Sequence, residues 1–157
     1  MLPLKMLVLD VDGTLTDGKI YMGEQGELMK AFHAHDAQGL RKLSRLGIKT
    51  IILTGRESNI VLLRAKEMEI SQVYQKVEDK KERLIKIVKE NNLSFQDVGY
   101  IGDDENDLEA MQLCGFKACP FDAVEKIKNI VDYISPCTSG NAAVREIIES
   151  KILSEGR

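Results

Sequence analysis

The chain lacks most of what would make it a disulfide-bonded or membrane-bound protein. It has no tryptophan, three prolines and three cysteines, and aromatic residues make up 5% of its 157 residues. Since the cysteines are odd in number and have no CxxC spacing, neither a disulfide framework nor a zinc site is predicted. The apolar N-terminal stretch is broken by Pro3 and Lys5 and ends at Asp10, which predicts neither a membrane span nor a signal peptide. We therefore expect a cytoplasmic protein with reduced thiols.

Charge of one sign is not concentrated anywhere in the chain. The formal net charge is -3 and the basic residues are scattered, so neither a nucleic acid nor an anionic membrane is predicted as a partner. Hydrophobic residues make up 43% and charged residues 30%, which excludes the composition of a disordered chain. A chain of this length can bury enough surface for one core. We predict a single domain over residues 1–157 that binds a small molecule.

Short apolar runs alternate with segments of helical periodicity along most of the chain. Strands are predicted from Met6 and over 48–53, 73–74, 98–101, 116–119 and 131–134. Helices are predicted over 37–45, 58–68, 106–113 and 142–153, after Asp79, and from Asp122 to about 129, with Asp36, Asp79 and Asp122 as N-caps. This alternation predicts right-handed βαβ units, and hence an α/β fold with a parallel sheet between layers of helices.

Residues 18–33 interrupt the alternation. Two short segments, 19–22 and 28–32, are joined by 23–26 with glycine at both ends, which predicts a β-hairpin. An isolated two-stranded ribbon is marginal in water, and this one would expose a large apolar surface. We expect another surface to cover its apolar residues, which are Ile20, Tyr21, Met22, Leu28, Met29 and Phe32.

Polar residues follow three of the predicted strands. Asp10 and Asp12 follow the first, Thr54 and Gly55 follow the second long one, and 103–104 follow the strand at 98–101. Because the carboxyl ends of parallel strands form the ligand-binding edge of a sheet, we expect these groups to meet. The two aspartates after the first strand repel each other, so they require either a cation or a shared proton.

These residue types are those that hydrolysis of a phosphate monoester requires. Asp10 can attack phosphorus to form an aspartyl-phosphate, and Asp12 can protonate the leaving alkoxide and then deprotonate the hydrolytic water. Asp10, the backbone carbonyl of Asp12 and Asp103 can hold Mg²⁺, which prefers oxygen ligands.

A second group of residues can bind the phosphoryl oxygens. Thr54, Gly55 and Lys80 are predicted to do so, together with Asn106 at the start of a helix. Asp104 and Asp107 are predicted to support the site, with Asp107 orienting either Lys80 or a metal-bound water. An acidic pair after a strand is more often a turn and helix cap, and the charge pattern around 79–83 does not by itself choose between Lys80 and Lys81.

In this order, the residues resemble the haloacid dehalogenase superfamily of phosphatases. The resemblance implies a Rossmann-like, doubly wound sheet, Mg²⁺ dependence, an aspartyl-phosphate and the choice of Lys80. Only the hairpin separates Thr14 from the helix near Asp36, so the chain resembles the branch without a cap domain. The resemblance is carried by Asp10, Asp12, Gly13, Thr14, Thr54, Lys80 and the segment 102–107.

Within that branch the chain is similar to phosphatases of 3-deoxy-D-manno-octulosonate 8-phosphate, in lipopolysaccharide biosynthesis. The segments 15–18, 53–56 and 143–146 carry this similarity. It implies a homotetramer in which the hairpins form a central barrel, with Arg56 and Arg145 near the sugar acid. Arg56 favours an eight-carbon substrate over a nine-carbon one.

Three alternatives remain open on the sequence. One is a phosphatase for a nine-carbon sugar-acid 9-phosphate, and another is a catalytically weak assembly module. The third is a receiver-like phosphoacceptor domain, which also combines acidic residues, Mg²⁺, Thr and Lys. The position of Asp10 and Asp12 on the first strand argues against a receiver, since receivers carry the phosphoacceptor on a later strand.

Overall fold

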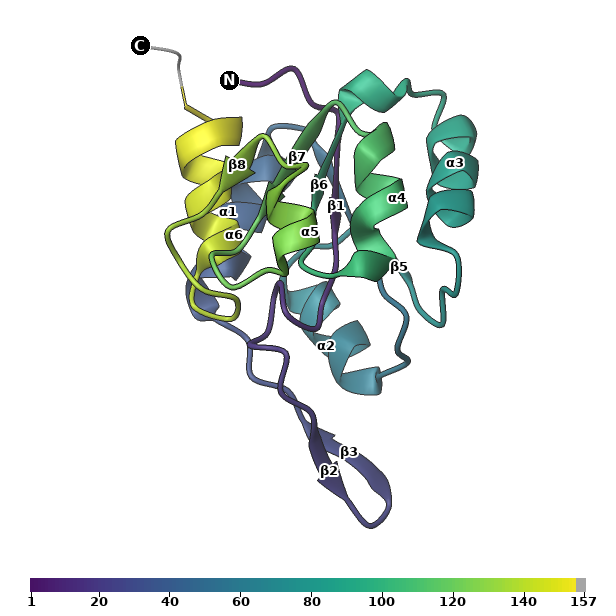
Figure 1. The fold of residues 1–157 in the computed structure, drawn as a ribbon, viewed down its shortest axis with the longest axis vertical. Helices are drawn as coiled ribbons and strands as arrows, with labels where there is room; N and C mark the ends of the chain where they lie inside the picture. The colour runs from purple at the N-terminus through teal and green to yellow at the C-terminus, as the bar shows by residue number, and fades with distance from the viewer. Residues whose placement is uncertain (155–157) are drawn as a thin grey trace.

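A computed structural model describes residues 1–154, with a six-stranded sheet at its centre (Figure 1). All five strand pairs are parallel, in the order β5-β4-β1-β6-β7-β8, so the predicted α/β fold is confirmed. The strands are β1 (Met6–Leu9), β4 (Lys49–Leu53), β5 (Gln72–Tyr74), β6 (Val98–Ile101), β7 (Phe116–Cys119) and β8 (Tyr133–Ile134).

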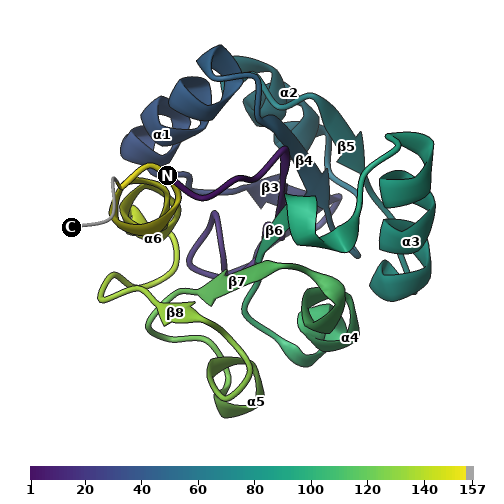
Figure 2. The same ribbon diagram turned by 90° about the horizontal axis from the view of Figure 1, so that it is seen from above.

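Helices cover both faces of the sheet, as the view along the strands shows (Figure 2). Helices α1 (Ala34–Arg45), α2 (Asn59–Glu67) and α6 (Ala143–Ile147) pack on one face, and a π-helical turn (Ile148–Ile152) extends α6. Helices α3 (Lys80–Glu90), α4 (Glu105–Leu113) and α5 (Glu125–Lys128) pack on the other, and a 3-10 turn (Phe95–Asp97) precedes β6. The sheet is therefore doubly wound.

The central strand β1 is buried on both faces. Leu7 and Leu9 belong to the core under α1, α2 and α6, whereas Met6 and Val8 belong to the core under α3, α4 and α5. All four side chains are fully buried. An uninterrupted apolar run is what a strand between two helical layers requires, because alternate residues point to opposite faces.

The predicted hairpin is present as β2 (Tyr21–Gly23) and β3 (Gly26–Met29), an antiparallel pair. Its turn is shorter than predicted, because Gly23 and Gly26 pair with each other and leave only two residues between the strands. We call residues 18–33 the flap. It extends from the carboxyl edge of the sheet away from the helical layers (Figure 1), and within residues 1–154 no cap domain is inserted.

Two predicted helix starts are wrong, both at aspartates that have distant partners. Helix α1 begins at Ala34 rather than 37, because the His33 side chain accepts the His35 N–H and caps it. Asp36 lies buried in the first turn, where it accepts the backbone N–H of Arg145 at 2.8 Å.

The second wrong start is at α5. Asp122 was predicted as its cap, but the helix follows Val124, and Asp122 accepts both the N–H and the hydroxyl of Ser139. By contrast, the predicted cap of α3 is confirmed, since Asp79 accepts the Glu82 N–H at 2.8 Å. An aspartate that local sequence predicts as a helix cap does not cap the helix where its carboxylate accepts hydrogen bonds from a residue distant in sequence.

Two of the three cysteines take up core positions, and Cys137 is half-buried. Cys114 and Cys119 are buried, and burial raises the pKa of each thiol to about 12, so both are inert at neutral pH. Across residues 1–154 no helix has the length and apolarity to cross a membrane.

Candidate active site

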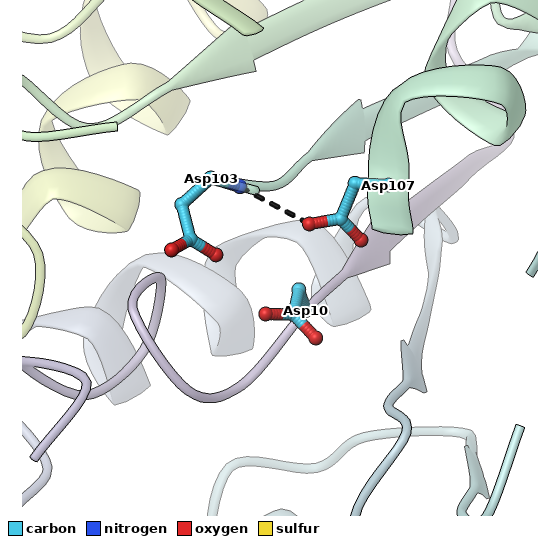
Figure 3. Close-up of side chains that lie close together, drawn as sticks. All are labelled: Asp10, Asp103 and Asp107. Carbon is cyan, nitrogen blue, oxygen red and sulfur yellow. Dashed lines mark hydrogen bonds between the residues drawn. The ribbon is translucent and has the colours of Figure 1, made fainter. Parts of the chain in front are cut away.

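The ends of three adjacent strands bring the predicted site residues together. Asp10 follows β1, Thr54 follows β4 and Asp103 follows β6 by two residues, and these strands lie side by side in register. Figure 3 shows Asp10, Asp103 and Asp107 directed toward one another. One carboxylate oxygen from each of the three lies within 4.8 Å of the others. This cluster lies at the carboxyl edge of the sheet, where α/β folds bind ligands.

Lys80 is the cation of the cluster. Its ammonium lies 2.7 Å from Asp10 Oδ1 and 2.6 Å from Asp107 Oδ1, and its side chain is 1% exposed. The neighbouring Lys81 instead pairs with Glu109 on the surface and is 45% exposed. Lys80, the first residue of α3, therefore points toward the edge of the sheet, and Lys81 points to solvent. The structure thus distinguishes two lysines that the charge pattern of the sequence did not.

Asp107 connects Lys80 to the rest of the site. The Tyr100 hydroxyl donates to its Oδ1 at 2.8 Å, and the backbone N–H groups of Asp103 and Asp104 donate to its Oδ2 at 3.2 and 3.4 Å. Sequence analysis missed Tyr100. A signal was available, since a hydroxyl in a buried strand needs a hydrogen-bond partner and this one lies three residues before Asp103.

Gly13 allows Asp103 to approach the loop after β1. Its φ is +92°, and a Cβ at this position would lie 2.0 Å from Asp103 Oδ2. The next residue, Thr14, donates its hydroxyl to Asp103 Oδ1 at 3.3 Å. The turn after Asp12 is thus shaped around the third carboxylate, which only glycine permits.

The electrostatics of the cluster favour a bound cation. Burial, followed by the charge of Asp107, raises the pKa of Asp10 to about 6, although Lys80 opposes this. Burial and the charges of Asp10 and Asp107 raise the pKa of Asp103 to about 8. For Lys80, burial acts to lower the pKa, but Asp10 and Asp107 outweigh it and hold the pKa above its ordinary value. Three carboxylates against one ammonium leave negative charge uncompensated, and the all-oxygen donor set fits Mg²⁺.

A pocket of about 190 Å³ opens beside the cluster. The carboxylate of Asp12 lies at the pocket and apart from the other three, with Lys30 Nζ at 2.5 Å and Arg56 Nε at 3.9 Å. Sequence analysis missed Lys30, because a lysine in a hairpin is by default solvated. The pocket contains most of the predicted site residues, and its lining consists of Asp10, Asp12, Thr54, Gly55, Arg56, Asp104 and Asn106.

Arg145 is the predicted site residue that the structure brings neither to this pocket nor to the cluster of Asp10, Asp103, Asp107 and Lys80. It lies in α6, where its guanidinium pairs with Glu149 at 2.6 Å and its N–H donates to Asp36. A contact between Arg145 and substrate would have to be made in a neighbouring subunit, as the family resemblance implies, and it stays a prediction.

Comparison with known proteins identifies the class to which this fold and site belong. Residues 64–148 match the family model described as haloacid dehalogenase-like hydrolase. The chain belongs to this family, and the predicted membership is confirmed. A hydrolase family also removes the support for the receiver interpretation.

Within that family, the chain is similar to phosphatases of one branch. It is 33% identical over 154 residues to the 3-deoxy-D-manno-octulosonate 8-phosphate phosphatase KdsC of Escherichia coli K12, covering 98% of this chain and 82% of that protein. It is 39% identical to the Moraxella catarrhalis 3-deoxy-D-manno-octulosonate 8-phosphate phosphatase, solved with magnesium, phosphate and KDO. That alignment covers 94% of this chain and 84% of that one, with a TM-score of 0.90.

A third relative is the cobalt-bound deoxy-D-mannose-octulosonate 8-phosphate phosphatase of Haemophilus influenzae. It is 32% identical, with a TM-score of 0.89 over 93% of this chain and 85% of that one. Both solved relatives hold a divalent metal ion, in agreement with the Mg²⁺ predicted from the carboxylates.

Proposed function

We propose that this protein is a Mg²⁺-dependent phosphomonoester hydrolase that releases phosphate from 3-deoxy-D-manno-octulosonate 8-phosphate through an aspartyl-phosphate. The observation that carries the proposal is the ammonium of Lys80 between Asp10 and Asp107, with Asp103 beside them, at a pocket lined by Asp10. The named activity of the relatives supports the choice of substrate.

Asp10 is the proposed nucleophile. Its carboxylate oxygen forms a bond to phosphorus as the ester P–O bond breaks, and Asp12 donates a proton to the departing alkoxide. Asp12, now a carboxylate, takes a proton from the water that attacks the aspartyl-phosphate, and phosphate leaves. Both carboxylates line the pocket, and Lys80 keeps the Asp10 side chain in place.

The phosphoryl oxygens are assigned to groups at the other side of the pocket. The Thr54 hydroxyl, the Gly55 N–H and the Asn106 amide can donate to them, and Lys80 supplies positive charge behind Asp10. Asp104 caps α4, which starts beside the pocket, and Asp107 holds Lys80. Because the transition state for phosphoryl transfer is stabilised mainly by fixed charges and donors, this preorganisation is the chief task of the protein.

Asp10, the carbonyl of Asp12 and Asp103 would hold Mg²⁺. When bound, the ion supplies the positive charge that lets a carboxylate approach a phosphate anion. Asp107 has less freedom to ligate an ion, since Tyr100, Lys80 and two backbone N–H groups already occupy its oxygens.

Two arginines are proposed to recognise the sugar acid. Arg56 lines the pocket with a side chain 48% exposed, and a guanidinium suits the carboxylate of a sugar acid. Arg145 is proposed to reach the substrate in a neighbouring subunit.

We also propose a homotetramer that associates through the flap. Its apolar side chains are exposed, with Leu28 at 67%, Met22 at 59% and Met29 at 53%, on a two-stranded ribbon that no other element within residues 1–154 covers on this side. Sedimentation equilibrium tests this: a tetramer is expected, and Leu28→Ser should shift the population toward smaller species. A monomer at all concentrations would contradict the proposal. A cytoplasmic location stays a prediction.

Phosphate release over a panel of esters tests the proposed reaction. With Mg²⁺, 3-deoxy-D-manno-octulosonate 8-phosphate is expected to have a higher kcat/KM than a nine-carbon sugar-acid 9-phosphate or glucose 6-phosphate, and chelation with EDTA should abolish turnover. Asp10→Asn should lower kcat by at least about 10³-fold, because the amide is not a nucleophile. Preference for the nine-carbon ester would overturn the substrate, and a tetramer without phosphatase activity would support the assembly module.

A further inference from the structure

We propose that Lys30, in the flap, is a positioning residue for Asp12. This inference rests on the proposed function, since it assigns Lys30 the task of orienting the acid that protonates the leaving group. The Lys30 ammonium lies 2.5 Å from Asp12 Oδ1 and 3.1 Å from Glu27 Oε2, although the residue is 18 positions away from Asp12 in sequence.

The ion pair is buried, which makes it more than a surface contact. The Lys30 side chain is 1% exposed, and those of Glu27 and Asp12 are 14% and 18% exposed. Burying an ammonium is costly unless anions surround it, and here two carboxylates do. An exposed ion pair contributes little to stability, but breaking a buried pair leaves an uncompensated charge and costs much more.

The backbone of the flap explains how both charged residues face inward. Glu27 belongs to β3, and in a continuing strand a residue three positions later would face the opposite side. The strand ends at Met29, however, so its alternation does not fix the side chain of Lys30, which meets Glu27.

Glu27 anchors this arrangement to the body of the protein. Its Oε1 accepts the hydroxyl of Ser58 at 2.5 Å, and Ser58 is the N-cap of α2. The backbone N–H of Ser58 in turn donates to the side-chain oxygen of Gln75 at 2.7 Å. A continuous set of polar contacts therefore runs from α2 through Glu27 and Lys30 to Asp12.

The two oxygens of Asp12 are left with different surroundings. Oδ1 is held by Lys30, whereas Oδ2 has Arg56 Nε at 3.9 Å and, over residues 1–154, receives no hydrogen bond. One oxygen is thus fixed and the other remains available for proton transfer. Catalysis by a general acid depends on holding the proton donor in line with the leaving oxygen, so the loss of this contact should lower the rate of the step that needs the proton.

Lys30 is not proposed to bind the phosphate itself. Both of its contacts are to carboxylates, and it is absent from the lining of the pocket that holds Asp10 and Thr54. A phosphate ligand would contribute equally to every phosphate ester, whereas a residue that orients Asp12 should matter according to the leaving group. That difference can be measured.

The experiment compares the sugar-acid phosphate with p-nitrophenyl phosphate, whose nitrophenolate departs without a proton. In Lys30→Met, kcat/KM, which reports the steps up to departure of the leaving group, should fall by about 10²-fold for the sugar-acid phosphate, the usual contribution of general acid catalysis, while kcat/KM for the aryl ester stays within about threefold. Lys30→Arg should recover part of the loss. Lys19→Met is the matched control, because Lys19 is a flap lysine whose side chain is 72% exposed, and it should leave both rates unchanged.

Equal losses of kcat/KM on the two esters, or no loss on either, would overturn the inference. Activity on the aryl ester shows that the variant is folded, and Glu27→Gln, which weakens the same contact, should give a smaller loss selective for the sugar ester. If the unaltered protein hydrolysed neither ester, the proposed function would be wrong. In that case hydrogen exchange over residues 10–18 still tests whether Lys30 holds Asp12. Exchange should be faster in Lys30→Met than in Lys19→Met, and equal exchange in the two variants would overturn the positioning role.

Discussion

The body of the protein buries an apolar core, whereas the least exposed side chains of the flap are charged. In the body, the strand Met6–Leu9 is fully buried and apolar. In the flap, Lys30 and Glu27 are buried, while Leu28 is 67% exposed. The body can bury apolar groups because helices cover both faces of its sheet, whereas among the described residues no second layer packs on the ribbon of the flap. Ion pairs therefore hold the flap in position, and its exposed apolar side chains are available for contact with another surface.

The largest difference should be found between two adjacent lysines at the edge of the body. Lys80→Met removes the ammonium between Asp10 and Asp107, so kcat for phosphate release should fall by about 10³-fold or more. Lys81→Met, which removes only a surface pair with Glu109, should leave kcat within about twofold. Steady-state kinetics at saturating Mg²⁺ measure both. Similar losses in the two variants would contradict the separation of these lysines by burial.

A pair of aliphatic truncations compares the two regions directly. Ile52→Ala, at a fully buried site in β4, should lower the free energy of unfolding by about 2–5 kcal/mol. Leu28→Ala in the flap should change it by no more than about 0.5 kcal/mol under conditions where the protein is monomeric. Urea denaturation at several protein concentrations measures this. A large loss for Leu28→Ala without association would mean that the flap is part of the core.

Asp36 lies close to the point where the flap ends and the body begins, and its titration should make the stability of the protein depend on pH. Burial raises its pKa to about 6, although the N–H of Arg145 opposes the shift, and over the described residues its Oδ2 has no hydrogen-bond partner. Because the folded state holds this proton more tightly than the unfolded state, its contribution to stability is present below about pH 4 and is lost as the pH rises to about 6. The loss should be on the order of 3 kcal/mol.

Asp36→Asn should remove this pH dependence, because the amide oxygen can still accept the Arg145 N–H but carries no charge. Urea denaturation of both proteins from pH 4 to pH 7 measures the difference. If the two curves stayed parallel across this range, Asp36 would not be the titrating group.

The smallest effect is expected from a hydroxyl inside the body. Tyr100→Phe removes the donor to Asp107 Oδ1 and should lower the free energy of unfolding by about 1–2 kcal/mol, since Lys80 still pairs with that oxygen. Tyr74→Phe is the control, because the Tyr74 hydroxyl bonds Gln72 at the surface, and its effect should stay below about 0.5 kcal/mol. Equal effects would show that Asp107 does not depend on Tyr100.

Local patterns predicted the elements that are stabilised by local interactions. The structure confirms the predicted strands at 98–101 and 116–119 and the predicted cap at Asp79. In each case the residues that determine the element, an apolar run or a capping carboxylate, lie within the element or next to it. The helix starts predicted at Asp36 and Asp122 were wrong because these carboxylates instead accept hydrogen bonds from residues more than ten positions away, Arg145 and Ser139 respectively. Distance in sequence also explains why Lys30 was missed, since its partner Asp12 lies 18 positions away, whereas Tyr100 lies only seven positions from Asp107.

The sequence by itself determined the alternation of strands and helices and the chemistry available at the strand ends, since both follow from residue types and spacing. Only the tertiary structure decided which lysine faces Asp10, and that a flap lysine holds Asp12. The reason is physical: burial and pairing of a charge depend on which segments pack beside it, and those partners come from other parts of the chain.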